Sequence, residues 1–154
     1  MSDVEKHEGG CACGEVRYKT SAYPTHTAVC HCRYCQLRTG SAFGVSVYFE
    51  RNAVEKLSGK LQKFEYETES GNKVCTEFCV ACGTTVYWSA EAFDGTVGIG
   101  GGTFDPPSFW YDIKREVFCR SKAPFSENVI NDKYQTSPIY NQVTVDPYRK
   151  SGSG

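Results

Sequence analysis

Seven of the nine cysteines in this chain fall into three short clusters, and cysteines at such spacing are typical metal ligands. The clusters are Cys11-Ala-Cys13, Cys30-His-Cys32-Arg-Tyr-Cys35 and Cys79-Val-Ala-Cys82. A zinc ion prefers four ligands in a tetrahedron. A structural site fills all four positions with protein atoms, whereas a catalytic site keeps one for water or substrate. Seven thiols divide into four and three, which predicts one closed site that stabilises the fold and one open site that can do chemistry.

The first and third clusters are expected to form the closed site. Each ends in a cysteine followed directly by a glycine, Gly14 or Gly83, and glycine readily takes the positive φ that turns backbone N–H groups toward the sulfurs. The third cluster has the spacing of a zinc knuckle. We therefore expect the four thiols of these two clusters to share one metal ion: Cys11, Cys13, Cys79 and Cys82. Spacing alone also allows the first pair to share a metal with Cys32 and Cys35.

The middle cluster offers three thiols, Cys30, Cys32 and Cys35, within six residues, and it leaves the fourth position of a tetrahedral metal unassigned. A substrate thiol that binds at that position would be ionised at neutral pH. The alternative is a second structural site, because Cys75 or Cys119 could complete the shell. A further hypothesis is redox sensing, in which the three thiols form disulfides when the metal leaves.

The composition is that of a single domain. The chain has 154 residues, of which 40% are hydrophobic and 14% aromatic, so it can bury a core. The net charge of −1 provides no basic surface for nucleic acid. Residues 1–8 contain no apolar signal region, and no apolar stretch reaches the roughly 18 residues of a membrane span. We expect no membrane partner, a cytoplasmic location, and cysteines that serve as ligands or free thiols rather than as disulfides.

Short alternating runs separated by glycine or polar pairs predict a mainly β, antiparallel domain. The predicted strands lie at residues 15–20, 44–48, 61–68, 73–78, 84–88, 96–100 and 116–119. One short helix is predicted over residues 33–39, and it ends at Gly40 because glycine readily adopts the left-handed conformation after a helix. His31 lies between two proposed ligands, but side chains alternate in an extended segment, so it should point away from the metal and serve the structure.

Several motifs of the chain match a known pattern when they are taken together. They are Gly10-Cys11-Ala-Cys13-Gly14, the middle cluster with Thr39-Gly40-Ser41 behind it, Phe78-Cys79-Val-Ala-Cys82-Gly83-Thr84, and Gly102-Thr103-Phe104-Asp105. This set resembles the glutathione-dependent formaldehyde-activating enzyme family, whose domain also occurs in centromere protein V. The resemblance covers about residues 8 to 120.

The resemblance implies a zinc-binding β-tent of two small antiparallel sheets, and two Zn²⁺ ions per chain. The structural zinc would be held by Cys11, Cys13, Cys79 and Cys82, and the catalytic zinc by Cys30, Cys32 and Cys35. The implied activity is that of a carbon–sulfur lyase or synthase that forms or cleaves S-(hydroxymethyl)glutathione. The implied partner is a small thiol such as glutathione.

Glutathione carries carboxylates, which favour basic or hydrogen-bonding groups near the open site. The candidate substrate-binding residues around the middle cluster are Arg33, Arg38, Gly40 and Ser41. The competing hypothesis is that both metals are structural and that the protein is a zinc-stabilised interaction module without catalysis.

The chain is expected to divide into an N-terminal segment (1–7), the zinc-binding domain (8–120), an extended C-terminal arm (121–150) and a disordered tail or linker remnant (151–154). The arm contains prolines among polar residues, but its apolar side chains, such as Phe125 and Tyr140, are too numerous for a fully solvated tail. We expect part of the arm to pack on its own domain or on a neighbouring subunit, which would make a homo-oligomer.

Overall fold

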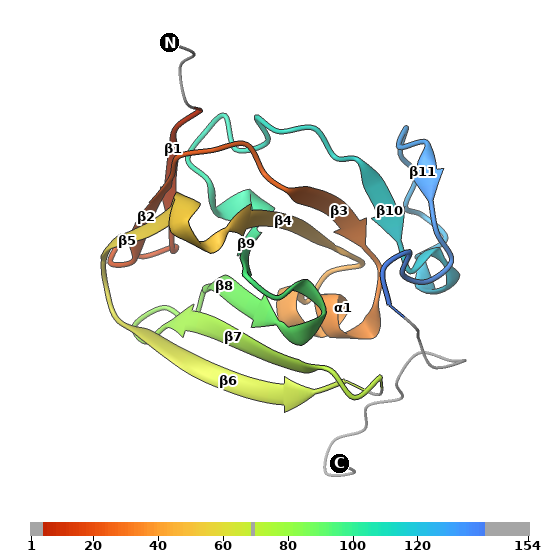
Figure 1. Cartoon of the computed structure of the whole chain (residues 1–154), viewed down its shortest axis with the longest axis horizontal. Helices are drawn as coiled ribbons and strands as arrows, with labels where there is room; N and C mark the ends of the chain where they lie inside the picture. The colour runs from red at the N-terminus through yellow and green to blue at the C-terminus, as the bar shows by residue number, and fades with distance from the viewer. Residues whose placement is uncertain (1–4, 69, 141–154) are drawn as a thin grey trace.

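The computed structural model describes residues 5–68 and 70–140, and this part of the chain contains two β-sheets and one α-helix (Figure 1). The smaller sheet is antiparallel and has the strand order β1-β2-β5. Its strands are β1 (His7–Gly10), β2 (Arg17–Thr20) and β5 (Val54–Ser58). The helix, α1 (Arg33–Thr39), occupies the predicted residues and ends at Gly40, whose φ of 65° is left-handed.

The larger sheet has eight strands in the order β11-β10-β3-β4-β9-β8-β7-β6. Figure 1 shows that it curves so that α1 lies on its inner side. Its strands are β3 (His26–Cys30), β4 (Gly44–Glu50), β6 (Leu61–Glu67), β7 (Lys73–Cys79), β8 (Thr85–Ala90), β9 (Thr96–Gly100), β10 (Arg115–Val117) and β11 (Asp132–Lys133). The predicted mainly β class with one short helix is confirmed.

The antiparallel pattern that the sequence predicts does not hold at one edge of the larger sheet. Strand β10 pairs in parallel with both β3 and β11. Parallel neighbours require a connection of a dozen or more residues. Such connections exist here, because the chain passes through β4 to β9 between β3 and β10, and through residues 118–131 between β10 and β11.

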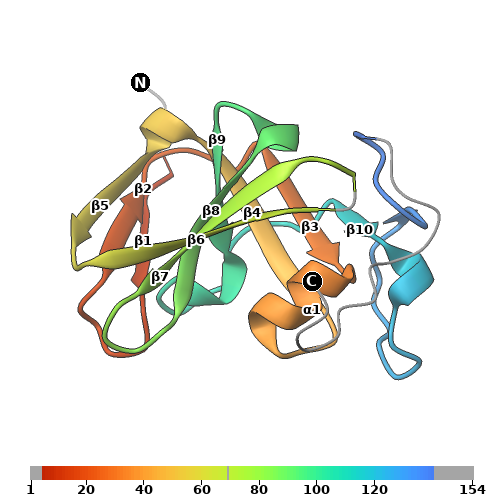
Figure 2. The ribbon, with the colours of Figure 1, turned by 90° about the horizontal axis from the view of Figure 1, so that it is seen from below.

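Strand β4 shows how the larger sheet separates a core face from a cavity face. Val47 and Phe49 are fully buried and belong to the core that also contains side chains of the small sheet. Ser46 and Tyr48 point to the opposite face, where they line a cavity, because side chains alternate along a strand. Figure 2 shows the small sheet and α1 toward opposite sides of the molecule, in agreement with this division.

The first part of the C-terminal arm packs on its own domain. Strand β11 extends the larger sheet beside β10, and the N–H of Tyr134 donates to the carbonyl of Glu116 at 2.9 Å. The oligomer that the arm was expected to make stays a prediction. Residues 141–150 of the arm and the tail 151–154 lie outside the described residues. In the described chain, no helix has the length and hydropathy of a membrane-spanning segment.

Candidate metal centres and the adjoining cavity

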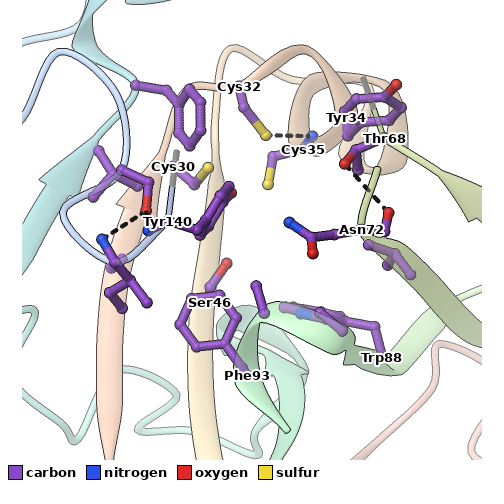
Figure 3. A pocket seen from close by; sticks show the side chains of 18 of the residues that line it. Cys30, Cys32, Tyr34, Cys35, Ser46, Thr68, Asn72, Trp88, Phe93 and Tyr140 are labelled. Carbon is purple, nitrogen blue, oxygen red and sulfur yellow. Dashed lines mark hydrogen bonds between the residues drawn. The ribbon is translucent and has the colours of Figure 1, made fainter. Parts of the chain in front are cut away.

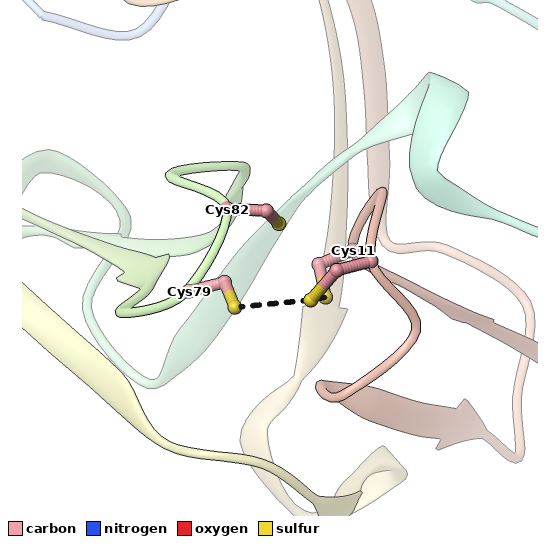
Figure 4. A group of neighbouring side chains, drawn as sticks. Cys11, Cys79 and Cys82 are labelled. Carbon is pink, nitrogen blue, oxygen red and sulfur yellow. Dashed lines mark hydrogen bonds between the residues drawn. The ribbon is translucent and has the colours of Figure 1, made fainter.

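The structure brings the first and third cysteine clusters together as one four-cysteine centre (Figure 4). The four Sγ atoms lie within 4.8 Å of one another. The distance is 3.5 Å from Cys11 Sγ to Cys13 Sγ and 3.8 Å from Cys13 Sγ to Cys79 Sγ. A tetrahedron of zinc–sulfur bonds of about 2.3 Å separates its sulfurs by about 3.8 Å, so the donor set fits a zinc ion. The alternative pairing of the first cluster with Cys32 and Cys35 is wrong.

Two turns of similar geometry build the four-cysteine centre. The first connects β1 to β2 and the second follows β7, and the glycine after each cysteine pair has a φ of 85° or 78°. Backbone N–H groups donate to the sulfurs, from Val16 to Cys11 at 3.2 Å and from Ala81 to Cys79 at 3.4 Å. Burial raises the pKa of Cys11, but hydrogen bonds, first the one from Val16, outweigh it and lower that pKa, which favours the thiolate form that binds metal.

The middle cluster forms a separate three-cysteine centre, whose sulfurs also lie within 4.8 Å of one another. Cys30 is the last residue of β3, and Cys32 caps the N-terminus of α1, where its Sγ accepts from the N–H of Cys35 at 3.4 Å. In the described part of the chain, no fourth cysteine, histidine or carboxylate joins this group. Cys75 is excluded because its neighbours in β7 line the cavity, so that its own side chain faces the other side of the sheet. Cys119 Sγ contacts the carbonyl of Glu116 at 3.7 Å instead.

Each centre holds a thiol that ionises easily. At the four-cysteine centre, hydrogen bonds from the side chain and backbone of Thr84 lower the pKa of Cys82 to about 5. At the three-cysteine centre, hydrogen bonds from Cys30 and Cys32 hold the pKa of Cys35 well below its ordinary value, and a nearby arginine adds to this effect. A bound metal ion would also ionise the other thiols of each centre.

The three-cysteine centre opens into a cavity of about 150 Å³ between α1 and the inner face of the larger sheet (Figure 3). Most of its large lining side chains are aromatic: Tyr34, Tyr48, Tyr66, Trp88, Phe93, Phe118 and Tyr140. The basic lining residues are His26, Arg38 and Arg115. Among the described residues, no aspartate or glutamate lines this cavity. The site therefore favours a ligand that combines a flat apolar part with negative charge.

Arg38 is the predicted substrate-binding residue that lines the cavity. Its guanidinium carbon lies 4.0 Å from the centre of the Trp88 ring, which holds the charge by a cation–π contact. Its Nη2 atom is buried, and the guanidinium lies close enough to Cys35 to lower the pKa of that thiol. A Cβ on Gly44 would lie 2.5 Å from this Nη2, so glycine at that position gives the guanidinium its room.

Three other residues predicted to bind substrate lie away from the cavity lining: Arg33, Gly40 and Ser41. Their role in substrate binding stays a prediction. The sequence analysis missed the aromatic lining as a group. The sequence signal that could have revealed this lining is the alternation of side chains along a strand. Tyr48 alternates with the core residues of β4, and Trp88 follows the core residue Tyr87 in β8.

His31 is fully buried and turned away from the cavity lining, as expected from its place between two ligands. Its Nε2 lies 2.9 Å from Oε1 of the equally buried Glu116, which also contacts Lys122 at 3.2 Å and Lys133. Burial alone would raise the pKa of Glu116, but hydrogen bonds from Lys133, Asn128, Lys122 and His31 outweigh it and lower the pKa to about 2. This network, which the sequence did not reveal, connects the three-cysteine loop to the C-terminal arm.

Comparisons with known proteins agree with this geometry. Residues 6–121 match a family described as Glutathione-dependent formaldehyde-activating enzyme (GFA). The matched range includes all seven clustered cysteines and ends before most of the arm. Among solved structures, the crystal structure of a Rhodobacter sphaeroides protein superimposes with a TM-score of 0.53 at 16% identity, over 69% of this chain and 96% of that chain. At this identity the likeness concerns the fold alone. No curated protein matches the chain.

Proposed function

The chain belongs to the glutathione-dependent formaldehyde-activating enzyme family, and from this premise we propose that it is a zinc-dependent carbon–sulfur lyase or synthase. The proposed reaction forms or cleaves the adduct of a small thiol and an aldehyde, in the simplest case S-(hydroxymethyl)glutathione. One observation carries the proposal. The centre with three thiols opens into a cavity, whereas four thiols enclose the other centre.

The proposed division of labour assigns one Zn²⁺ to each centre. Cys11, Cys13, Cys79 and Cys82 would hold the structural ion. Cys30, Cys32 and Cys35 would hold the second ion and leave its fourth position to the substrate sulfur. When bound there, the ion supplies a Lewis-acid position at which a thiol is ionised at neutral pH.

The bond changes in the proposed reaction balance without an oxidant or reductant. The substrate sulfur forms a bond to the carbonyl carbon, the C=O π electrons move to oxygen, and that oxygen takes up the proton that the thiol released. Cleavage is the reverse. The chain's own residues would enclose the reactants, because the aromatic side chains that surround the centre exclude water from the carbonyl.

The charge of the cavity supports an anionic thiol such as glutathione. Arg38 and Arg115 line the cavity, and no acidic residue of the described chain opposes them there. Arg38 lies beside Cys35 and lowers the pKa of that thiol, so its positive charge is next to the three-cysteine centre. A guanidinium is well suited to a carboxylate, because charge-assisted hydrogen bonds are about twice as strong as neutral ones.

The test is a rate measurement on the zinc-loaded protein with glutathione and formaldehyde. Exchange spectroscopy by NMR would follow the adduct, because the two reagents also combine without help. We expect the wild type to exceed the uncatalysed rate at micromolar concentration, and Cys35→Ser to return it to background. The matched control is Cys75→Ser, which alters a thiol outside both centres.

A wild-type protein that holds two zinc ions and still gives no rate above background with glutathione or another small thiol would defeat the proposal. Two tightly held ions without any catalysis would favour the interaction module. Reversible zinc release on mild oxidation, again without catalysis, would favour the redox sensor.

A further inference from the structure

The cavity beside the three-cysteine centre offers more aromatic surface than formaldehyde, with one carbon and one oxygen, can use. Two pairs of rings are stacked in its walls. The centroids of Tyr48 and Phe93 are 4.5 Å apart at an interplanar angle of 21°, and those of Tyr34 and Tyr66 are 5.1 Å apart at 14°. These rings come from separate elements that meet at the site: β4, residues 91–93, α1 and β6.

The orientation of the Tyr48 ring is held by the structure around it. Its hydroxyl accepts a hydrogen bond from Nε1 of Trp88 at 3.0 Å, and the two rings are perpendicular at 6.1 Å. Trp88 is in turn covered by Arg38. A ring that is fixed in this way presents its remaining surface to a ligand at little cost in side-chain entropy.

The C-terminal arm supplies one wall of the same cavity. Residues 137–140 line it, and the Tyr140 ring meets Phe93 edge-to-face at 6.3 Å and 87°. Figure 3 shows Tyr140 projecting into the cavity near Cys30 and facing Asn72 across it. The family match ends at residue 121, so this wall belongs to a part of the chain outside the shared pattern.

From these contacts we infer that the substrate is an adduct of an anionic thiol with an aryl aldehyde, whose ring lies in the cavity against the side of Tyr140 that looks toward Asn72. Aromatic groups prefer edge-to-face and offset-stacked neighbours, and Tyr140, which packs on the Tyr48–Phe93 pair, offers such a neighbour at the cavity surface. The basic side chains would bind the carboxylates of the thiol. The inference rests on the proposed function, and the bond changes are those given there, with an aryl group on the carbonyl carbon in place of hydrogen.

Binding of stable thioethers tests the aromatic wall without turnover. Isothermal titration calorimetry on the zinc-loaded full chain would compare S-benzylglutathione with S-methylglutathione. We expect the benzyl compound to bind at least about tenfold more tightly. Tyr140→Ala should reduce this preference roughly fivefold, and Tyr140→Phe should retain it. Phe125→Ala, which removes an aromatic side chain that is 81% exposed on the same arm, is the matched control and should leave the preference unchanged.

A parallel rate measurement separates failure of this inference from failure of the proposed function. It compares kcat/KM for benzaldehyde and formaldehyde with glutathione as the thiol. Acceleration with formaldehyde together with equal affinity for the two thioethers would overturn the inference alone. A benzyl preference without acceleration of either aldehyde would overturn the proposed function and the reaction inferred from it. If folded Tyr140→Ala keeps the full preference for the benzyl compound, the C-terminal arm does not contribute to the site of the aryl ring.

Discussion

Both centres are built from cysteine thiols, but one joins segments that are far apart in the sequence and the other uses neighbouring residues. The four-cysteine centre joins the turn after β1 to the turn after β7, so that its contacting sulfurs are up to 66 positions apart. The three-cysteine centre draws all its thiols from the six residues 30–35, which run from the last residue of β3 into the first turn of α1. A metal at the first centre therefore closes a long loop, whereas a metal at the second constrains a segment that is already local.

This difference is the physical basis for the proposed division between a stabilising centre and a catalytic one. Closing a long loop opposes the conformational entropy of the unfolded chain, and metal binding to a site that exists only after folding adds to folding stability. A metal held by neighbouring residues contributes less to holding distant elements together. Such a site can therefore use three protein ligands and leave the fourth position to a substrate. Solvent exposure does not mark the centre for which we propose catalysis, because Cys13 and Cys82 are exposed whereas Cys30 is buried.

The largest effect should follow Cys79→Ser at the four-cysteine centre. The variant leaves three thiols to hold the ion between two distant turns, and about 4 kcal/mol of lost stability would lower Tm by about 10 °C or more. Metal analysis and thermal unfolding would show one ion lost together with this drop. The control is Cys75→Ser in the same strand. Loss of the ion at unchanged Tm would mean that the four-cysteine centre does not hold the turns together.

The second-largest effect concerns the three-cysteine centre, where loss of a ligand should lower the reaction rate rather than the stability. Cys32→Ser should remove the second ion and reduce the rate of adduct formation at least about 100-fold, because one ligand of the reacting metal is lost. Its Tm should stay within about 4 °C of the wild type. Unfolding as severe as that of Cys79→Ser would instead identify both centres as structural and support the interaction module.

Much of both centres could be predicted because their signals are local. A cysteine pair followed by glycine specifies a turn that presents two sulfurs, and this holds wherever the fold places the turn. The helix over residues 33–39 was also predictable, since Gly40 marks its end. Alternation revealed β2 and β4 for the same reason, because each strand buries one face.

The remaining features depend on contacts that no local pattern contains. Strand β1 reads His7-Glu-Gly-Gly10 and lacks any alternation, so only its pairing with β2 makes it a strand. The parallel pairing of β10 is equally long-range. The cavity lining combines residues from six strands with α1 and the arm, and only the register of the larger sheet brings them together.

A third prediction concerns the support that the three-cysteine loop receives from Glu116. Glu116→Gln removes a buried charge that pairs with two lysines and orients His31, so it should cost roughly 3 kcal/mol at pH 7. Chemical unfolding would measure this cost. Metal content at both centres should stay at two ions, because Glu116 is not a ligand. Loss of the second ion in this variant would show that the local centre depends on the arm.

The stability that Glu116 contributes should depend on pH, and its lowered pKa gives the direction of this dependence. The pKa of Glu116 is lowered in the folded state to about 2, so its stabilising contribution is complete above the unfolded value near 4.5 and is lost as the pH falls toward 2. The stability difference between wild type and Glu116→Gln should therefore narrow by roughly 1 kcal/mol between pH 7 and pH 4. Metal release at acid pH affects both proteins alike, and a constant difference would contradict the assignment.

The smallest effect should distinguish two arginines of α1 that the sequence alone could not tell apart. Arg38 lies over Trp88 and lines the cavity, whereas Arg33 does not line it. Arg38→Gln should raise KM for glutathione about tenfold, equivalent to about 1.4 kcal/mol, with a smaller change in kcat, because it removes a binding charge and leaves the metal ligands intact. Arg33→Gln is the matched control and should change KM by less than about twofold. The reverse order would place the thiol's carboxylates outside the cavity and return Arg33 to the binding site that its position in the sequence suggested.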